Sequence, residues 1–139
     1  MYLTENLSQQ MIDAGAELTK QLDRSMMIVK ASFWYLVSDE RAWRLIIATP
    51  EVHTSGPRKV YQRVQTALGK LQMAKKGLIA SAMRGLSLED IVVVEPSNPL
   101  IILLGQAVGT DKGISHIRFS NNTVGGQFIE DAYIYRLMR

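Results

Sequence analysis

Apolar residues recur at helical spacing near the start of the chain. Over residues 5–24 they fall on one side of a helix and polar residues fall on the other, which predicts an amphipathic helix packed on a core. Thr4 is the predicted N-cap of this helix, since a hydroxyl side chain can accept a hydrogen bond from a free backbone N–H in the first turn. The apolar positions are Leu7, Met11, Ala14, Leu18 and Leu22.

Two segments rich in β-branched and aromatic residues follow, at residues 28–37 and 42–49. The polar tetrad between them, residues 38–41, predicts a β-hairpin with a four-residue loop. In the register that this loop imposes, both faces of the hairpin are largely apolar, so the sheet needs cover on both sides. The predicted pairs are Leu36 with Trp43 and Trp34 with Leu45 on one face, and Phe33 with Ile46 and Tyr35 with Arg44 on the other.

Residues 50–57 are predicted to form a loop that leads into a second helical region. Ser55 is a candidate cap, and Pro57 suits the first turn of a helix, where its missing N–H costs nothing. His53 could help to bind an anion at this helix start, because the backbone N–H groups there point outward. The segment has one glycine and lacks the Gly-Lys-Ser/Thr ending of a P-loop, which favours an ordinary capping loop.

The helical region that follows has its apolar residues within a sector of about 120°. It forms either one long helix that runs to about Arg84 or two helices that meet near Gly77. Lys75 falls inside the apolar sector, and this favours the break, because an unpaired buried ammonium group is costly.

Short β-branched runs predict further strands in the remainder of the chain. Their links are short, which favours antiparallel pairing. We therefore expect a single α+β domain over residues 1–139, in which a mostly antiparallel sheet of about five to six strands packs with an N-terminal helix and a long or broken basic amphipathic helix. The later strands are predicted at residues 91–94, 100–104, 116–120 and 132–137, with turns at 96–99 and 121–122.

Composition excludes several kinds of chemistry. The 139 residues include no cysteine, which rules out a disulfide scaffold, a thiolate zinc site, an iron–sulfur cluster and a cysteine nucleophile. The two histidines lie far apart, so we expect no dedicated metal site, and no dinucleotide or kinase signature points to a cofactor. No set of catalytic residues is assigned from these patterns.

Positive charge is concentrated in the second helical region. Residues 52–87 contain no acidic residue and seven basic ones, whereas the rest of the chain has 9 basic and 13 acidic residues. On a continuous helix, the basic residues would form a stripe of roughly 40 Å opposite the apolar sector. Such a row of cations suits a phosphate backbone. The candidate binding residues are Arg58, Lys59, Arg63, Lys70, Lys76 and Arg84.

Three functions are compatible with these observations. The first is a small non-enzymatic module that binds nucleic acid or another polyanion through the basic helix face. The second is a protein-interaction or assembly subunit without a nucleic-acid role, whose basic helix meets an acidic partner. The third is a metal-independent nuclease or phosphoesterase, in which a histidine transfers protons and a cation neutralises the phosphate. Its candidate residues are His116, Arg118, Tyr133 and Tyr135.

The sequence also suggests a location and an oligomeric state. The first six residues show neither the basic nor the apolar region of a secretory signal. The most apolar stretch, residues 91–108, is interrupted by Glu95, Pro96 and Pro99 and is not a membrane span. We therefore expect a cytoplasmic protein without a membrane partner. The two-sided apolar hairpin predicts a homodimer, in which a second copy would cover the second face.

Overall fold

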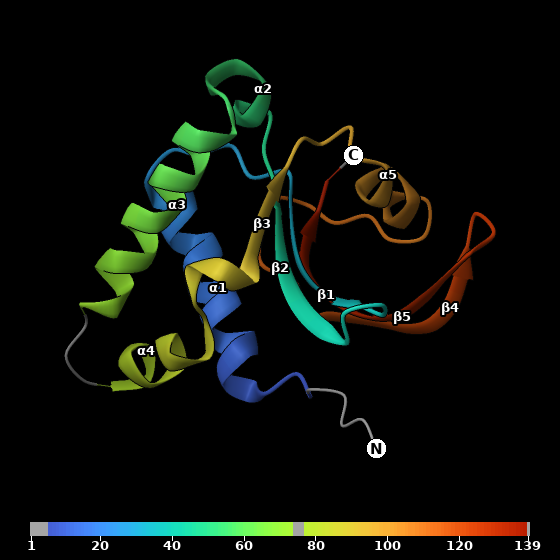
Figure 1. Ribbon diagram of the computed structural model, residues 1–139, viewed down its shortest axis with the longest axis horizontal. Coiled ribbons are helices and arrows are strands. Elements are labelled where there is room, and N and C mark those ends of the chain that lie inside the picture. The colour runs from blue at the N-terminus through green and yellow to red at the C-terminus, as the bar shows by residue number, and fades with distance from the viewer. Residues whose placement is uncertain (1–5, 74–76, 139) are drawn as a thin grey trace.

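A five-stranded sheet lies at the centre of the computed structural model, which describes residues 6–73 and 77–138 (Figure 1). The strand order is β3-β2-β1-β5-β4, and helices pack on both faces. The predicted α+β fold is confirmed. The strands are β1 (Ala31–Val37), β2 (Ala42–Ala48), β3 (Ile91–Val94), β4 (Ile117–Val124) and β5 (Gln127–Leu137).

The hairpin of β1 and β2 has the register that the alternation of side chains predicts. Trp34 is opposite Leu45, and Phe33 is opposite Ile46. The remaining predicted pairs are also present. A four-residue loop fixes which residues face each other, and a shift by one residue would turn every side chain to the other face.

The sheet is mixed rather than wholly antiparallel. Three neighbouring pairs are antiparallel, namely β1 with β2, β1 with β5 and β4 with β5. The fourth pair, β2 with β3, is parallel, with Leu45 opposite Ile91. A parallel pair needs a long crossover connection, and the helical region between β2 and β3 provides it.

Helices within the same chain cover both faces of the sheet (Figure 1). One core cluster joins α1 (Gln9–Arg24) and α3 (Pro57–Gln72) to the face that carries Trp34 and Leu45. A second cluster joins α5 (Pro99–Gly105) to the opposite face, where Phe33 is fully buried. The second face therefore needs no second copy of the chain, which removes the main reason for predicting a homodimer.

Helix α5 corrects the predicted strand at residues 100–104. The Asn98 side chain accepts a hydrogen bond from the Leu100 N–H at 2.9 Å, and Pro99 occupies the first turn. This is a typical helix start. A short apolar run does not by itself distinguish a buried strand from a buried helix, so the cap decides the outcome.

The start of α1 also differs from the prediction. The helix begins at Gln9, and the Ser8 side chain caps it by accepting a hydrogen bond from the Met11 N–H at 3.1 Å. Residues 6–8 precede the helix rather than belong to it. The proposed cap, Thr4, lies outside the described residues.

The basic helical region forms two helices, as predicted from the position of Lys75 in the apolar sector. Lys75 itself lies outside the described residues. Helix α3 ends at Gln72, and α4 (Gly77–Ala82) follows. Residues 51–55, predicted as part of a loop, form the short helix α2 (Glu51–Ser55). Gly56, with φ of 87°, is the N-cap of α3 in place of the proposed Ser55, while Pro57 occupies the first turn as expected.

The C-terminal hairpin turns later than predicted. Asn121 and Asn122 lie within β4, and the turn is formed by Gly125 and Gly126, whose φ values are 54° and 81°. Two adjacent residues with positive φ are typical of a tight hairpin turn that matches the twist of the strands. Strands β4 and β5 are consequently both longer than their predicted counterparts.

Candidate anion-binding site

The structure separates the described residues of the proposed binding face. Arg58, Lys59, Arg63 and Lys70 lie on α3, whereas Arg84 lies on the short helix η1 (Met83–Gly85). Lys76 lies outside the described residues. Because α3 has 16 residues, it is about 24 Å long, and the continuous stripe of roughly 40 Å does not form.

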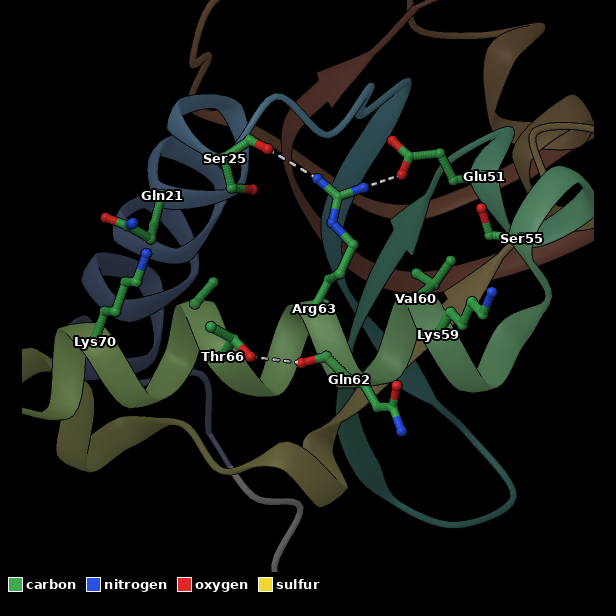
Figure 2. Close-up of a pocket in the computed structure, with 11 residues that line it drawn as sticks. Gln21, Ser25, Glu51, Ser55, Lys59, Val60, Gln62, Arg63, Thr66 and Lys70 are labelled. Carbon is green, nitrogen blue, oxygen red and sulfur yellow. Dashed lines mark hydrogen bonds and ion pairs between the residues drawn. The ribbon is translucent and has the colours of Figure 1, made fainter.

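The basic side of α3 borders a pocket of about 400 Å³. The end of α1, helix α2 and α3 as far as Lys70 enclose it (Figure 2). Lys59, Arg63 and Lys70 line it together with one carboxylate, that of Glu51. We call this cavity the basic pocket.

Arg63 forms the centre of the basic pocket and bridges its walls (Figure 2). Its guanidinium donates to the Ser25 carbonyl at 2.8 Å and pairs with the Glu51 carboxylate. Glu51 also accepts a hydrogen bond from the Ile28 N–H at 3.1 Å. Arg63 and Glu51 therefore fix the loop after α1 against α2 and α3, and the guanidinium is held in one orientation.

Lys59 and Lys70 lie at opposite ends of the basic pocket (Figure 2). Lys59 points toward α2 and Ser55, and Lys70 points toward α1 and Gln21. Both lysines are exposed, and neither ammonium group forms an ion pair or hydrogen bond with any residue in the described part of the chain. They can bind an incoming anion without breaking an existing contact.

The charge inside the basic pocket favours anions. Three cationic side chains face a single carboxylate, and no other acidic residue lines the cavity. Arg58, at the start of α3, adds a further exposed cation that has no partner in residues 6–73 or 77–138. The acid-free sequence identified this region, but it did not reveal that Arg63 is already paired, because Glu51 lies just before that stretch.

His53 does not contribute to the basic pocket. It lies on α2, is 83% exposed, and its Nδ1 is 3.3 Å from a carboxylate oxygen of Glu95. The proposed role of His53 at the start of the basic helix is therefore not supported, since its ring is directed toward the residue that follows β3.

The four residues proposed for a phosphoesterase lie together on one face of the sheet. The Nδ1 of His116 lies 2.9 Å from the Tyr133 hydroxyl, and the rings of Tyr133 and Tyr135 are 5.5 Å apart. Arg118 is the cross-strand neighbour of Tyr133. The sequence could not settle this arrangement, because it depends on the register of β4 and β5.

Among these four residues, Arg118 already forms an ion pair. Its guanidinium forms two hydrogen bonds with Asp131, at 2.7 and 2.5 Å, and lies 5.7 Å from the centre of the Trp43 ring. The hydrogen bonding that the guanidinium donates to Asp131 raises the pKa of Arg118 further, against the effect of burial. A phosphate would have to displace this carboxylate to reach Arg118.

The tyrosines are not poised to act as nucleophiles. Burial raises the pKa of the Tyr133 phenol, although Arg118 partly opposes the shift. Burial also raises the pKa of Tyr135, which accepts a hydrogen bond from the Trp34 indole at 3.1 Å and donates to the Ile12 carbonyl. Both phenols remain protonated at neutral pH and act as hydrogen-bonding groups.

Other cavities differ in character from the basic pocket. One of about 460 Å³ between α1 and α4 is lined by His116 together with Asp13, Glu17 and Lys20, so two carboxylates face a single ammonium group. Another, of about 630 Å³, lies beside α5 and has mainly apolar walls, with Lys30 as its charged residue. Within the described residues, no group of three or more His, Asp or Glu side chains could bind a metal ion.

Searches for similar proteins returned no match. No protein-family model, no curated protein and no solved structure matches the chain. Separately, none of the helices in residues 6–73 and 77–138 is both long enough and apolar enough to cross a membrane.

Proposed function

We propose that the protein is a non-enzymatic module that binds nucleic acid through the basic pocket. The observation that carries this proposal is the pair of exposed lysines, Lys59 and Lys70, which flank Arg63 and have no anionic partner among the described residues. Nucleic-acid phosphates supply the repeated negative charge that such a row of cations can neutralise, with release of counterions.

The binding residues are those of α3 rather than the whole predicted stripe. Lys59, Lys70 and Arg58 contact phosphates, and Arg63 contributes positive charge from a fixed position. Three or four neutralised phosphates on a single strand give a log–log salt slope of about −2 to −3. Arg84 lies on a different element, so its contribution is expected to be small.

Fluorescence anisotropy with labelled RNA and DNA, titrated at several salt concentrations, tests this proposal. The combined variant Lys59→Glu/Lys70→Glu should lower affinity at least tenfold and flatten the salt slope. The control variant Lys20→Glu/Lys112→Glu makes the same change in net charge at two exposed lysines outside the basic pocket, and it should retain most of the affinity. Equal loss in both variants would show that binding depends on net charge alone.

An assembly role is the alternative that uses the same surface. In that case Lys59 and Lys70 would meet an acidic patch on a partner or a second copy. Sedimentation at low and high salt distinguishes the two functions. Salt would dissociate an oligomer in the assembly role, whereas it would release nucleic acid and leave the sedimentation of the protein unchanged in the binding role.

A phosphoesterase built around His116 is the remaining candidate. The hydrogen bond between His116 and Tyr133 favours it, while the ion pair between Arg118 and Asp131 weakens it. A cleavage assay in the presence of EDTA, comparing the wild type with His116→Ala, tests this candidate. Equal activity of the two proteins would exclude His116 as a catalytic residue.

A further inference from the structure

The cations of the basic pocket lie in a recess rather than on an open ridge. Residues of α1 and α2, such as Gln21 and Ser55, form walls beside the cationic side chains of α3 (Figure 2). A duplex is stiff, with a persistence length of about 50 nm, so its phosphates cannot fold into such a recess. A single strand is flexible and can place one nucleotide in it.

The surface between the cations is largely apolar. Apolar atoms make up most of the lining, and Val60 and Ala67 contribute to it between Lys59 and Lys70. A phosphate alone would leave this surface uncovered. A ligand that combines an anionic group with a flat, weakly polar body would cover it, and a cavity of about 400 Å³ lies in the range of small-molecule pockets.

The polar groups of the basic pocket suit the edge of a base. The Gln21 amide nitrogen donates no hydrogen bond to any of the described residues and can donate to a ring nitrogen or carbonyl. The Thr66 hydroxyl donates to the Gln62 carbonyl at 3.0 Å and keeps its acceptor capacity. Both side chains lie on the lysine-lined cavity, so one ligand can reach amide, hydroxyl and ammonium groups together.

The two lysines can converge on the phosphates at either side of one base. Lys59 and Lys70 are eleven residues apart on one helix, which is about 16 Å along the axis. Each ammonium group is carried on a flexible four-carbon stem and can move inward toward the ligand. Between them, the fixed guanidinium of Arg63 offers a planar surface on which a base can stack.

From these observations we infer that the basic pocket accommodates one unstacked nucleotide, so that the protein binds single-stranded nucleic acid in preference to duplex. This inference rests on the proposed function and specifies its ligand. Lys59 and Lys70 bind the flanking phosphates, Arg63 stacks on the base, and Gln21 and Thr66 bind its edge.

An anionic lipid surface is the competing partner. Met26 is 83% exposed and Ile28 is 55% exposed, and both lie in the loop that Arg63 and Glu51 fix. Exposed apolar residues beside cations are typical of interfacial binding. An acyl chain in the basic pocket, however, would leave the Gln21 amide nitrogen without a hydrogen-bonding partner, which is unfavourable. The observations therefore favour a nucleotide.

The test compares a labelled twelve-nucleotide single strand with the same sequence as a duplex, using the full chain. Single-strand affinity should be at least tenfold higher. Adenosine monophosphate should displace the strand at a concentration at least tenfold lower than inorganic phosphate. Thr66→Leu, which narrows the basic pocket without changing its charge, should weaken this displacement about fivefold, whereas Thr54→Leu, an exposed position outside the cavity, should not.

The outcomes separate the inference from the proposed function. Equal affinity for single strand and duplex, or displacement by phosphate as readily as by the nucleotide, would overturn the inference and leave nucleic-acid binding intact. No binding to either nucleic acid at low salt would overturn both. Binding to vesicles that contain phosphatidylserine, without binding to nucleic acid, would also overturn both and assign the basic pocket to a lipid surface.

Discussion

Gly15 lies at the closest contact between α1 and the sheet, and we predict that Gly15→Ala destabilises the protein. A Cβ atom at this position would lie 2.5 Å from the Tyr135 hydroxyl oxygen, 2.7 Å from the Trp34 indole nitrogen and 2.8 Å from a ring carbon of Tyr135. Two large, fully buried rings would have to move to admit one methyl group.

The magnitude follows from two contributions that destabilise the variant and one that opposes them. Overpacking a core typically costs about 1–3 kcal/mol. Movement of the rings also weakens the hydrogen bonds that Trp34 donates to Met11 and Tyr135, each worth about 1 kcal/mol. Against this, alanine is favoured over glycine within a helix by about 1 kcal/mol. The expected net loss in the free energy of unfolding is about 2 kcal/mol.

Urea denaturation measures the effect, and Gly69→Ala is the matched control. Gly69 also lies within a helix, but a Cβ there would meet no atom within 4 Å. In this control, helix propensity alone should raise the free energy of unfolding by about 1 kcal/mol. With a urea dependence of about 1–3 kcal/mol per molar, Gly15→Ala should lower the midpoint by about 1 M. An unchanged or raised midpoint would refute the close packing of α1 on Trp34 and Tyr135.

Two further predictions concern polar contacts between distant segments. Thr19 and Ser32 are fully buried and joined by a hydrogen bond of 2.7 Å; Thr19→Val should therefore cost about 1–3 kcal/mol in urea denaturation, and the double variant Thr19→Val/Ser32→Ala should cost less than the sum of the single variants. For Asp131, burial acts to raise the carboxyl pKa, but hydrogen bonds from Arg118 and Ser120 outweigh it and lower the pKa overall. The ion pair therefore stabilises the protein above about pH 4, which is the pKa of an aspartate in the unfolded chain. The difference in the free energy of unfolding between the wild type and Asp131→Asn should shrink as the pH falls below that value. A difference that stays constant down to about pH 2 would contradict this assignment.

The parts of the fold that the sequence predicts depend on local patterns. The hairpin of β1 and β2 follows from alternation and a four-residue loop, and the break after α3 follows from a lysine in an apolar sector. Helix α5 was missed, because five consecutive apolar residues suit a strand as well as a helix and the decisive cap is a single side chain, Asn98. The parallel pairing of β2 with β3 joins segments that are far apart in sequence, and no local pattern encodes it.

The candidate site is predictable only in part for the same reason. The acid-free stretch identified the cations of α3, but the walls of the basic pocket come from Gln21 on α1, from Ser25 just after α1 and from Glu51 on α2. The contact between His116 and Tyr133 required the register of β4 and β5. Charge segregation therefore located the proposed binding surface, while the cavity that gives it shape arises from tertiary packing.

Glu51 links the stability of this region to its proposed function. Its carboxylate pairs with Arg63 and accepts the Ile28 N–H, so it stabilises the fold. The same negative charge opposes the binding of an anion in the basic pocket. Removing that charge should therefore change stability and affinity in opposite directions.

We expect Glu51→Gln to lower the free energy of unfolding by about 1 kcal/mol, since the amide keeps an acceptor but loses the charge-assisted hydrogen bonds. Two unit charges about 7 Å apart interact by about 0.6 kcal/mol in water and by more near a protein surface. Affinity for a single strand at low salt should therefore rise about three- to tenfold. Glu89→Gln, an equal change of charge at an exposed position outside the basic pocket, should alter affinity much less. If Glu51→Gln instead weakens binding, the orientation of Arg63 governs affinity more than the net charge of the cavity does, and nucleic acid is recognised by the fixed guanidinium rather than by the two flexible lysines.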